Sequence, residues 1–160
     1  VSAMIDEVDL VDLLDNVISD VRSHRAGNYD VSFTATDRAV VPCDATLMRQ
    51  AFLNLLINAV EAMEGKGKLA VGFERLRERG KAHVRITVED SGPGIPPGQM
   101  AKIFLPFFTT KRTGTGLGLS LVQKAVLAHN GRIEVQNIEV KGARFTVTLP
   151  LSEKTETSMP

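Results

Sequence analysis

The chain reads Gly114-Thr115-Gly116-Leu117-Gly118-Leu119 and continues directly into an apolar helical segment at residues 120–129. The first turn of a helix has backbone N–H groups without partners and carries the positive end of the helix dipole. Glycines before it let the main chain approach a ligand closely, so the stretch predicts an anion site, most naturally for phosphates. A plain connector is the alternative. The spacing differs from the dinucleotide fingerprint and from the Walker motif, because no strand directly precedes the glycines and no lysine followed by Ser or Thr closes the stretch.

The periodicity of apolar residues around this stretch predicts helices alternating with strands. Helical spacing occurs at residues 11–21, and Asp44 is placed to cap a long helix over about residues 45–64. Strand-like alternation occurs at residues 31–35, 69–73, 84–88, 132–137 and 144–149, with a hairpin connection at 77–81. Every strand has one apolar face, so helices should cover one side of a mixed, mostly antiparallel sheet. The predicted fold class is α/β: a two-layer sandwich with about three helices on one face of the sheet.

The 160 residues suit a single domain, which we place at residues 8–151. The 19 basic and 19 acidic residues cancel, so no net charge favours nucleic acid or an anionic membrane as a partner. No apolar run approaches the roughly 20 residues of a membrane span. The single Cys43 excludes an internal disulfide and fits a reducing compartment. We therefore expect a cytoplasmic domain, followed by a disordered polar tail at residues 152–160.

A polar stripe crosses the long helix, which is otherwise apolar around most of its circumference. Asn54, Asn58 and Glu61 stand at i, i+4 and i+7 and share one side of that helix. Asparagine is a poor helix former and is costly to bury without partners, so two of them in mid-helix indicate a functional site. Amide oxygens suit a Mg²⁺ ion that is shared with phosphates. The alternative is a stripe that caps a neighbouring loop.

A second motif, Asp90-Ser91-Gly92-Pro93-Gly94-Ile95, follows directly on the strand at 84–89. A carboxylate at the end of a strand can accept a hydrogen bond from an exocyclic amine, and glycines beside it allow a flat base to lie against the backbone. An ordinary turn explains the same residues equally well.

A loop of about 25 residues at 91–115 has no long periodicity and is long enough to be a lid or a binding segment. It contains Phe104, Phe107 and Phe108 within five positions. Aromatic residues grouped in this way indicate that part of the loop packs on the rest of the domain. Lys111 is a candidate for contact with a terminal phosphate as a mobile cation, and an ordinary surface lysine is the alternative.

Taken in this order, the four motifs closely resemble those of the catalytic and ATP-binding domain of sensor histidine kinases. These kinases share the GHKL superfamily and its Bergerat fold with gyrase-type topoisomerases, Hsp90 and the mismatch-repair ATPases. Residues 54–58 resemble the N box, 90–94 the G1 box, 104–111 the F box and 114–118 the G2 box. Each motif alone is a weak signal, whereas four in order are specific. The Pro-Phe-Phe-Thr-Thr-Lys segment is most similar to kinases of the nitrogen-regulation type.

The resemblance implies ATP and Mg²⁺ as cofactors and a role for each matching residue. Asn58 would hold Mg²⁺, Asn54 would line the phosphate side of the cleft, and Asp90 would accept a hydrogen bond from the adenine amine. Lys111 is the one candidate for a catalytic role. The residues that the resemblance assigns to the nucleotide site are Asn54, Asn58, Asp90, Gly92, Gly94, Ile95, Thr109, Lys111, Gly114, Thr115, Gly116, Leu117, Gly118 and Leu119.

The resemblance further implies transfer of the ATP γ-phosphoryl group to a histidine on a helical dimerisation domain outside this chain. His24, His83 and His129 lack the Glu-x-x-x-Pro type of context that the family shows, so we expect them to be structural or surface residues. Residues 1–7 would be the linker from that domain of the same parent protein. A response regulator would act downstream, and this fragment alone would be monomeric. Membrane anchoring of the parent protein stays open.

Three other functions compete with this prediction. Gyrase-like ATPases have a glutamate base at the position of Asn54, and an amide cannot take a proton from water near neutral pH, so we expect slow hydrolysis of ATP. A gyrase- or chaperone-type ATPase, a degenerate nucleotide-binding regulatory module and a serine kinase of the anti-sigma type are the alternatives. Phosphotransfer to a helical partner would separate a histidine kinase from all three.

Overall fold

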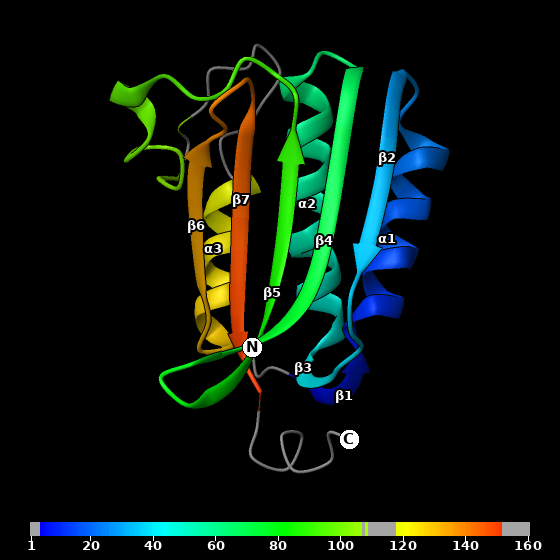
Figure 1. Cartoon of the computed structure of the whole chain (residues 1–160), viewed down its shortest axis with the longest axis vertical. Helices are drawn as coiled ribbons and strands as arrows, with labels where there is room; N and C mark the ends of the chain where they lie inside the picture. The colour runs from blue at the N-terminus through cyan, green and yellow to red at the C-terminus, as the bar shows by residue number, and fades with distance from the viewer. Residues whose placement is uncertain (1–3, 107, 109–117, 152–160) are drawn as a thin grey trace.

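The computed structural model describes residues 4–106, 108 and 118–151. In this part of the chain, one layer holds the helices α1 (Leu10–His24), α2 (Ala45–Ala62) and α3 (Gly118–Ala128). The other layer is a five-stranded sheet of β2 (Asn28–Ala35), β4 (Lys66–Glu78), β5 (Lys81–Asp90), β7 (Ala143–Pro150) and β6 (Arg132–Asn137), in that spatial order (Figure 1). β2 runs parallel to β4, and the other three pairs are antiparallel. The predicted two-layer α/β sandwich is confirmed.

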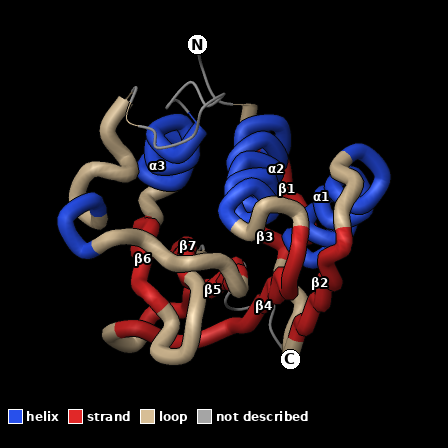
Figure 2. The backbone as a smooth tube through the Cα atoms, turned by 90° about the horizontal axis from the view of Figure 1, so that it is seen from above, coloured by secondary structure: helices blue, strands red, loops and turns tan. Residues whose placement is uncertain are grey.

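The helices cover one face of the sheet because alternate strand residues are apolar (Figure 2). In β5 the buried positions are Ala82, Val84, Ile86, Val88 and Asp90, while the residues between them are partly exposed. α2 lies at the centre of the helical layer, where its Phe52 is fully buried, and α1 and α3 pack on either side of it. The alternation along β5 places Asp90, its last residue, on the face that the helices cover.

Two short strands that the sequence did not predict, β1 (Ile5–Asp9) and β3 (Val40–Asp44), form a separate antiparallel pair. Each has only five residues, and acidic residues in β1 and Pro42 in β3 obscure the alternation. β1 begins inside the segment that we expected to be a linker, so folded structure starts before residue 8. Whether residues 1–7 connect to another domain stays a prediction. Cys43 of β3 is buried, and this burial raises the pKa of its thiol to about 11.

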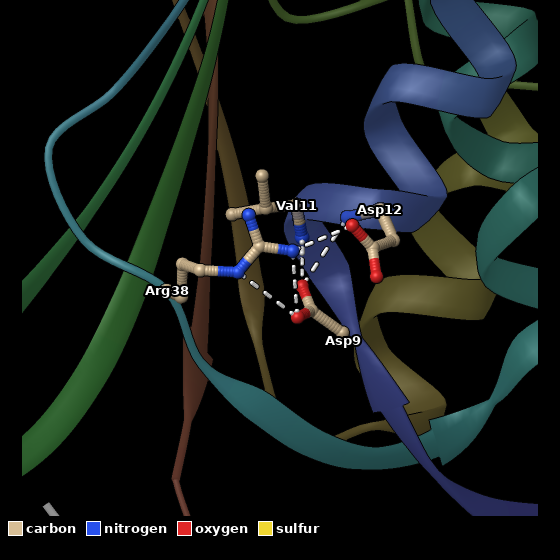
Figure 3. Close-up of polar contacts among 4 residues, drawn as sticks. All are labelled: Asp9, Val11, Asp12 and Arg38. Carbon is tan, nitrogen blue, oxygen red and sulfur yellow. Dashed lines mark hydrogen bonds and ion pairs between the residues drawn. The ribbon is translucent and has the colours of Figure 1, made fainter.

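Asp9 joins β1 to α1 and is the N-cap of that helix (Figure 3). Its Oδ1 accepts hydrogen bonds from the backbone N–H groups of Val11 at 3.0 Å and Asp12 at 3.2 Å. Arg38, just before β3, donates from Nη2 to Asp9 Oδ2 at 2.9 Å and to Asp12 Oδ1 at 2.5 Å. Arg38 is well exposed, so solvent screens these ion pairs and they contribute little to stability. Their main effect is to fix where α1 starts relative to the small sheet.

His129 links the end of α3 to the start of α2. Its Nε2 accepts a hydrogen bond from the backbone N–H of Asp44 at 2.9 Å, and its Nδ1 donates to the carbonyl oxygen of Ala125 at 2.7 Å. Only the neutral imidazole makes both bonds. Asp44 in turn caps α2 by accepting from the N–H of Leu47 at 3.1 Å, the main reason that the pKa of its carboxyl is lowered. His129 therefore has a structural role, and the two helices run antiparallel.

We expect His129→Ala to lower the free energy of unfolding by about 1–2 kcal/mol, because the partly buried N–H of Asp44 loses its acceptor. His24→Ala is the matched control, since His24 is exposed and, among the described residues, bonds to the carbonyl oxygen of Asp20 one turn away in the same helix; its effect should stay within about 0.5 kcal/mol. Urea denaturation measures both values. Equal stability of the two variants would contradict the role given to His129.

Candidate nucleotide-binding site

Asp90 carries a carboxylate at the end of a central strand, and the residue is buried, with only 4% of its surface exposed. Its Oδ1 accepts a hydrogen bond from the N–H of Gly92 at 2.9 Å. Burial raises the pKa of this carboxyl, and the backbone N–H groups of Gly92 and Ala143 oppose that rise. A carboxylate has about four acceptor positions, so two backbone donors leave it able to accept from a ligand.

The raised pKa of Asp90 has a cost for folding. The carboxyl binds its proton more tightly in the folded chain, so protonation of Asp90 stabilises the fold. This stabilisation is fully present below the unfolded-state pKa of about 3.9. That contribution is lost as the pH rises through the folded-state value, so at neutral pH the ionised group weakens the fold. A buried acid kept at such a cost, at the end of a strand, is typical of a binding site.

The turn after Asp90 lies against the last residues of α2. A Cβ at Gly92 would lie 2.9 Å from the carbonyl oxygen of Ala62, so only glycine fits there without a shift of the backbone. The Sδ of Met63 lies 3.4 Å from the backbone nitrogen of Ser91. Ser91 Oγ also accepts from the N–H of Lys68 in β4 at 2.9 Å. The Asp90–Gly92 segment is thereby held between the sheet and the end of α2.

The asparagines of the polar stripe are on the same helix. Asn54 and Asn58 are half-buried and Glu61 is exposed. At a rise of 1.5 Å per residue, Asn58 lies about 6 Å and Asn54 about 12 Å along the axis from Ala62, which contacts the Asp90 turn. The structure thus brings the predicted metal ligand and the predicted base acceptor to one end of α2, with Asn54 farther away.

The start of α3 lies level with this stripe along the axis of α2. α3 is antiparallel to α2 and packs on it, with its last turn at Asp44. Counting back at 1.5 Å per residue, Gly118 is about level with the segment of α2 that carries Asn54 and Asn58. Gly118 is exposed, and Leu119 packs against the core. The other predicted residues of this region, namely Thr109, Lys111, Gly114, Thr115, Gly116 and Leu117, lie outside the described residues.

Phe104 and Phe108 of the F-box-like segment pack on the domain as expected. The ring of Phe104 meets that of Phe145 in β7 edge to face, with centroids 6.3 Å apart. Phe108 is partly buried against the core, and Ile103 is 8% exposed. Phe107 lies outside the described residues. These contacts hold Ile103, Phe104 and Phe108 against the core of the domain.

Asn137 at the end of β6 and Gly142 in the β6–β7 connection also contact the site, and neither was predicted from the sequence. Asn137 bonds with its amide to both backbone groups of Ile95, and each distance is 2.8 Å. Gly142 has a φ of +110°, and a Cβ there would lie 1.8 Å from the carbonyl oxygen of Asp90. An Asn at the end of a strand and a Gly before the next one are ordinary turn signals, so the sequence carried no indication of these contacts.

We expect Gly142→Ala to lower the free energy of unfolding by about 2–4 kcal/mol, because it adds a clash with the Asp90 backbone to an unfavourable φ. Gly80→Ala is the control: Gly80 also has a positive φ, +77°, but a Cβ there meets nothing within 4 Å. The control therefore isolates the backbone cost, about 1 kcal/mol. If urea denaturation gave equal losses for the two variants, close packing at Gly142 would be refuted.

A metal ion at this site would depend on few protein ligands. Across the described part of the chain, no group of three or more His, Cys, Asp or Glu side chains is arranged to hold a metal. Asn58 supplies a neutral amide oxygen, which fits Mg²⁺ when phosphate oxygens and water complete the octahedron. The donor set therefore fits a magnesium ion that arrives with a nucleotide.

The sheet with helices on one face, the buried acid at a strand end and the asparagine stripe beside it define an ATP-binding domain. Comparison with known families agrees. Residues 43–153 match the model of the histidine kinase-, DNA gyrase B- and HSP90-like ATPases, and the chain belongs to this family.

Individual relatives narrow the similarity to histidine kinases. The sensor histidine kinase ZraS of Salmonella typhimurium is 45% identical over 120 residues, which are 74% of this chain and 25% of ZraS. The chain thus spans about a quarter of that relative. The catalytic domain of the histidine kinase ThkA superimposes with a TM-score of 0.78 at 34% identity, over 92% of this chain and 98% of ThkA's.

Two further structures were solved as complexes. Full-length ShkA in complex with AMPPNP has a TM-score of 0.79 at 29% identity, over 95% of this chain and 32% of ShkA. ThkA in complex with the response regulator protein TrrA has a TM-score of 0.72 at 32% identity, over 94% of this chain and 42% of that one.

Proposed function

We propose that this chain is the ATP-binding catalytic domain of a sensor histidine kinase and transfers the γ-phosphoryl group of ATP to a histidine on a separate dimerisation domain. The observation that carries the proposal is the buried carboxylate of Asp90 at the end of β5. The turn that follows it packs against the last residues of α2, the helix that bears Asn58. Membership of the ATPase family and the similarity to sensor histidine kinases support it.

The residues divide into a base side and a phosphate side. On the base side, Asp90 accepts a hydrogen bond from the adenine amine, and Gly92, Gly94 and Ile95 shape the pocket. Because the acid is buried, this bond forms where water competes poorly, which makes the site selective for a base that has a donor at that position. A guanine presents a carbonyl oxygen there, and two acceptors would face each other.

On the phosphate side, Asn58 holds Mg²⁺, and the ion supplies neutralisation of the phosphate charge when it is bound. Asn54 lines the same side. The backbone N–H groups of Gly118 and Leu119 at the start of α3, together with Gly114, Thr115, Gly116 and Leu117, donate to phosphate oxygens. Thr109 and Lys111 are assigned to the terminal phosphate, and Lys111 is the catalytic candidate.

Phosphoryl transfer needs little covalent chemistry from this domain. The transition state depends on positioning and on stabilisation of charge, and the acceptor histidine supplies the nucleophile. Asn54 cannot act as a general base toward water, so ATP bound without an acceptor should be hydrolysed slowly. This distinguishes the proposal from a gyrase- or chaperone-type ATPase.

Calorimetric titration of ATP and ADP, with and without Mg²⁺, together with steady-state hydrolysis, tests the proposal. We expect micromolar to submillimolar binding that Mg²⁺ strengthens for ATP, with slow hydrolysis. Rapid hydrolysis by the chain alone would favour the ATPase alternative. No binding at millimolar nucleotide by a folded sample would overturn the proposal and leave a degenerate regulatory module.

The proposed partners are the histidine-bearing domain of the same parent protein and a response regulator. ThkA, which this chain resembles, was solved in complex with a response regulator, and this supports the second partner. We expect the fragment alone to be monomeric, since dimerisation in such kinases belongs to the helical domain. Among the described residues, no helix combines the length and the apolar character needed to cross a membrane.

A further inference from the structure

We infer that Asn137 is a positioning residue for nucleotide binding, because its amide holds Ile95 and thereby fixes the turn that presents Asp90 to the base. This inference rests on the proposed function. It adds a residue that lies 42 positions from Ile95 in the sequence and belongs to none of the four motifs.

The bond pattern is that of a two-point clamp. Asn137 Oδ1 accepts from the N–H of Ile95, and Asn137 Nδ2 donates to the carbonyl oxygen of the same residue, both at 2.8 Å. Ile95 lies five residues beyond the end of β5, where the sheet no longer fixes the backbone. A side chain that bonds both polar groups of one residue fixes its position and its orientation.

Position 94, directly before the residue that Asn137 binds, requires glycine. Its φ is +81°, and a Cβ there would lie 2.8 Å from Asn137 Oδ1. The glycine therefore allows a left-handed backbone and the close approach of the amide at once. The conformation of residues 92–95 and the side chain of Asn137 thus depend on each other.

The same connection also holds the other end of the turn. Gly142 lies against the carbonyl of Asp90, and the N–H of Ala143 counteracts the rise in the pKa of the Asp90 carboxyl. The N–H of Ile138 donates to the carbonyl oxygen of Gly142 at 2.9 Å and closes the connection on itself. Residues 137–143 therefore contact both ends of the 90–95 segment and fix its backbone conformation.

The test compares the affinities of the complete chain for ATP and GTP by calorimetry. Asn137→Ala removes both bonds, and we expect ATP affinity to fall about 5- to 10-fold, since both bonds are exposed and water partly replaces them. GTP affinity should change less than about twofold, because a loosened turn discriminates poorly between bases. The ATP-to-GTP ratio therefore narrows, which a loss of stability alone would not cause.

Two further variants complete the experiment. Gln136→Ala alters the neighbouring residue on the opposite face of β6 and should leave both affinities unchanged. Asn137→Asp keeps the acceptor for the N–H of Ile95 but loses the donor, so its ATP affinity should lie between the other two. If Asn137→Ala does not fold, Asn137→Asp replaces it as the test variant.

The outcomes separate the inference from the proposed function. If the unmodified chain binds ATP in preference to GTP and the Asn137 variants keep its affinities and ratio, the inference is overturned while the proposed function stands. If the affinities for ATP and GTP fell by the same factor, Asn137 would have a merely structural role, and the inference would also be overturned. If the unmodified chain binds no nucleotide, the proposed function fails first.

Discussion

Asp90→Asn should weaken ATP binding at least about 100-fold, measured by calorimetry at neutral pH. The carboxylate is buried at the end of β5 and accepts hydrogen bonds from backbone donors on one side, which leaves acceptor capacity for the adenine amine. An amide in its place can turn its own N–H₂ group toward the adenine amine, and two donors then face each other where water cannot intervene. The variant loses the hydrogen bond to the adenine amine, and both the adenine amine and the new side-chain N–H₂ group are left without an acceptor; together these account for the lost affinity.

The fold of Asp90→Asn should survive. Asparagine removes a buried charge that weakens the fold at neutral pH, and this gain offsets the altered contact with the N–H of Ala143. We expect the free energy of unfolding to stay within about 1 kcal/mol of that of the unmodified chain. Glu89→Gln is the control, because Glu89 is the preceding residue, lies on the other face of β5 and pairs with Arg144. ATP affinity equal in both variants would contradict the role of Asp90.

Asn58→Ala should reduce phosphoryl transfer about 100-fold or more and remove the strengthening of ATP binding by Mg²⁺. In the proposed function the amide oxygen of Asn58 is the metal ligand that the protein supplies, and alanine would offer no replacement. Binding of ADP without Mg²⁺ should change less than about threefold, because the base side is intact. Transfer to a helical partner and titration with and without Mg²⁺ measure these effects.

Gln50→Ala is the control for Asn58→Ala. It removes an amide side chain from the same helix two turns earlier, at an exposed position. This variant should keep full transfer and full dependence on Mg²⁺. A normal response to Mg²⁺ in Asn58→Ala would show that the metal, if it binds, is held elsewhere.

The long elements of the fold could be predicted from the sequence because their signals are local. The helix predicted at about 45–64 is α2 at Ala45–Ala62, with Asp44 as its cap and glycines after it. The strand predicted at 132–137 has the bounds of β6. β1 and β3 could not be predicted in the same way, since five residues with interior charges or a proline show no clear period. These strands form because they pair with each other, which is a long-range property.

The same distinction separates the parts of the site. Asp90 and Gly92 stand together in one motif, and the sequence placed them correctly at a strand end followed by a tight turn. Asn137 and Gly142 contact that turn only because β7 brings the β6–β7 connection beside it. Their roles arise from tertiary contacts, so they cannot be found from local spacing.

Transfer of labelled phosphate from [γ-³²P]ATP to the histidine-bearing helical domain of the same parent protein tests the central claim most directly. We predict that this chain labels the domain when Mg²⁺ is present, that the label is labile in acid and stable in base, and that Asp90→Asn abolishes it. If the folded chain binds ATP and leaves the domain unlabelled, the chain is not the catalytic domain of a histidine kinase.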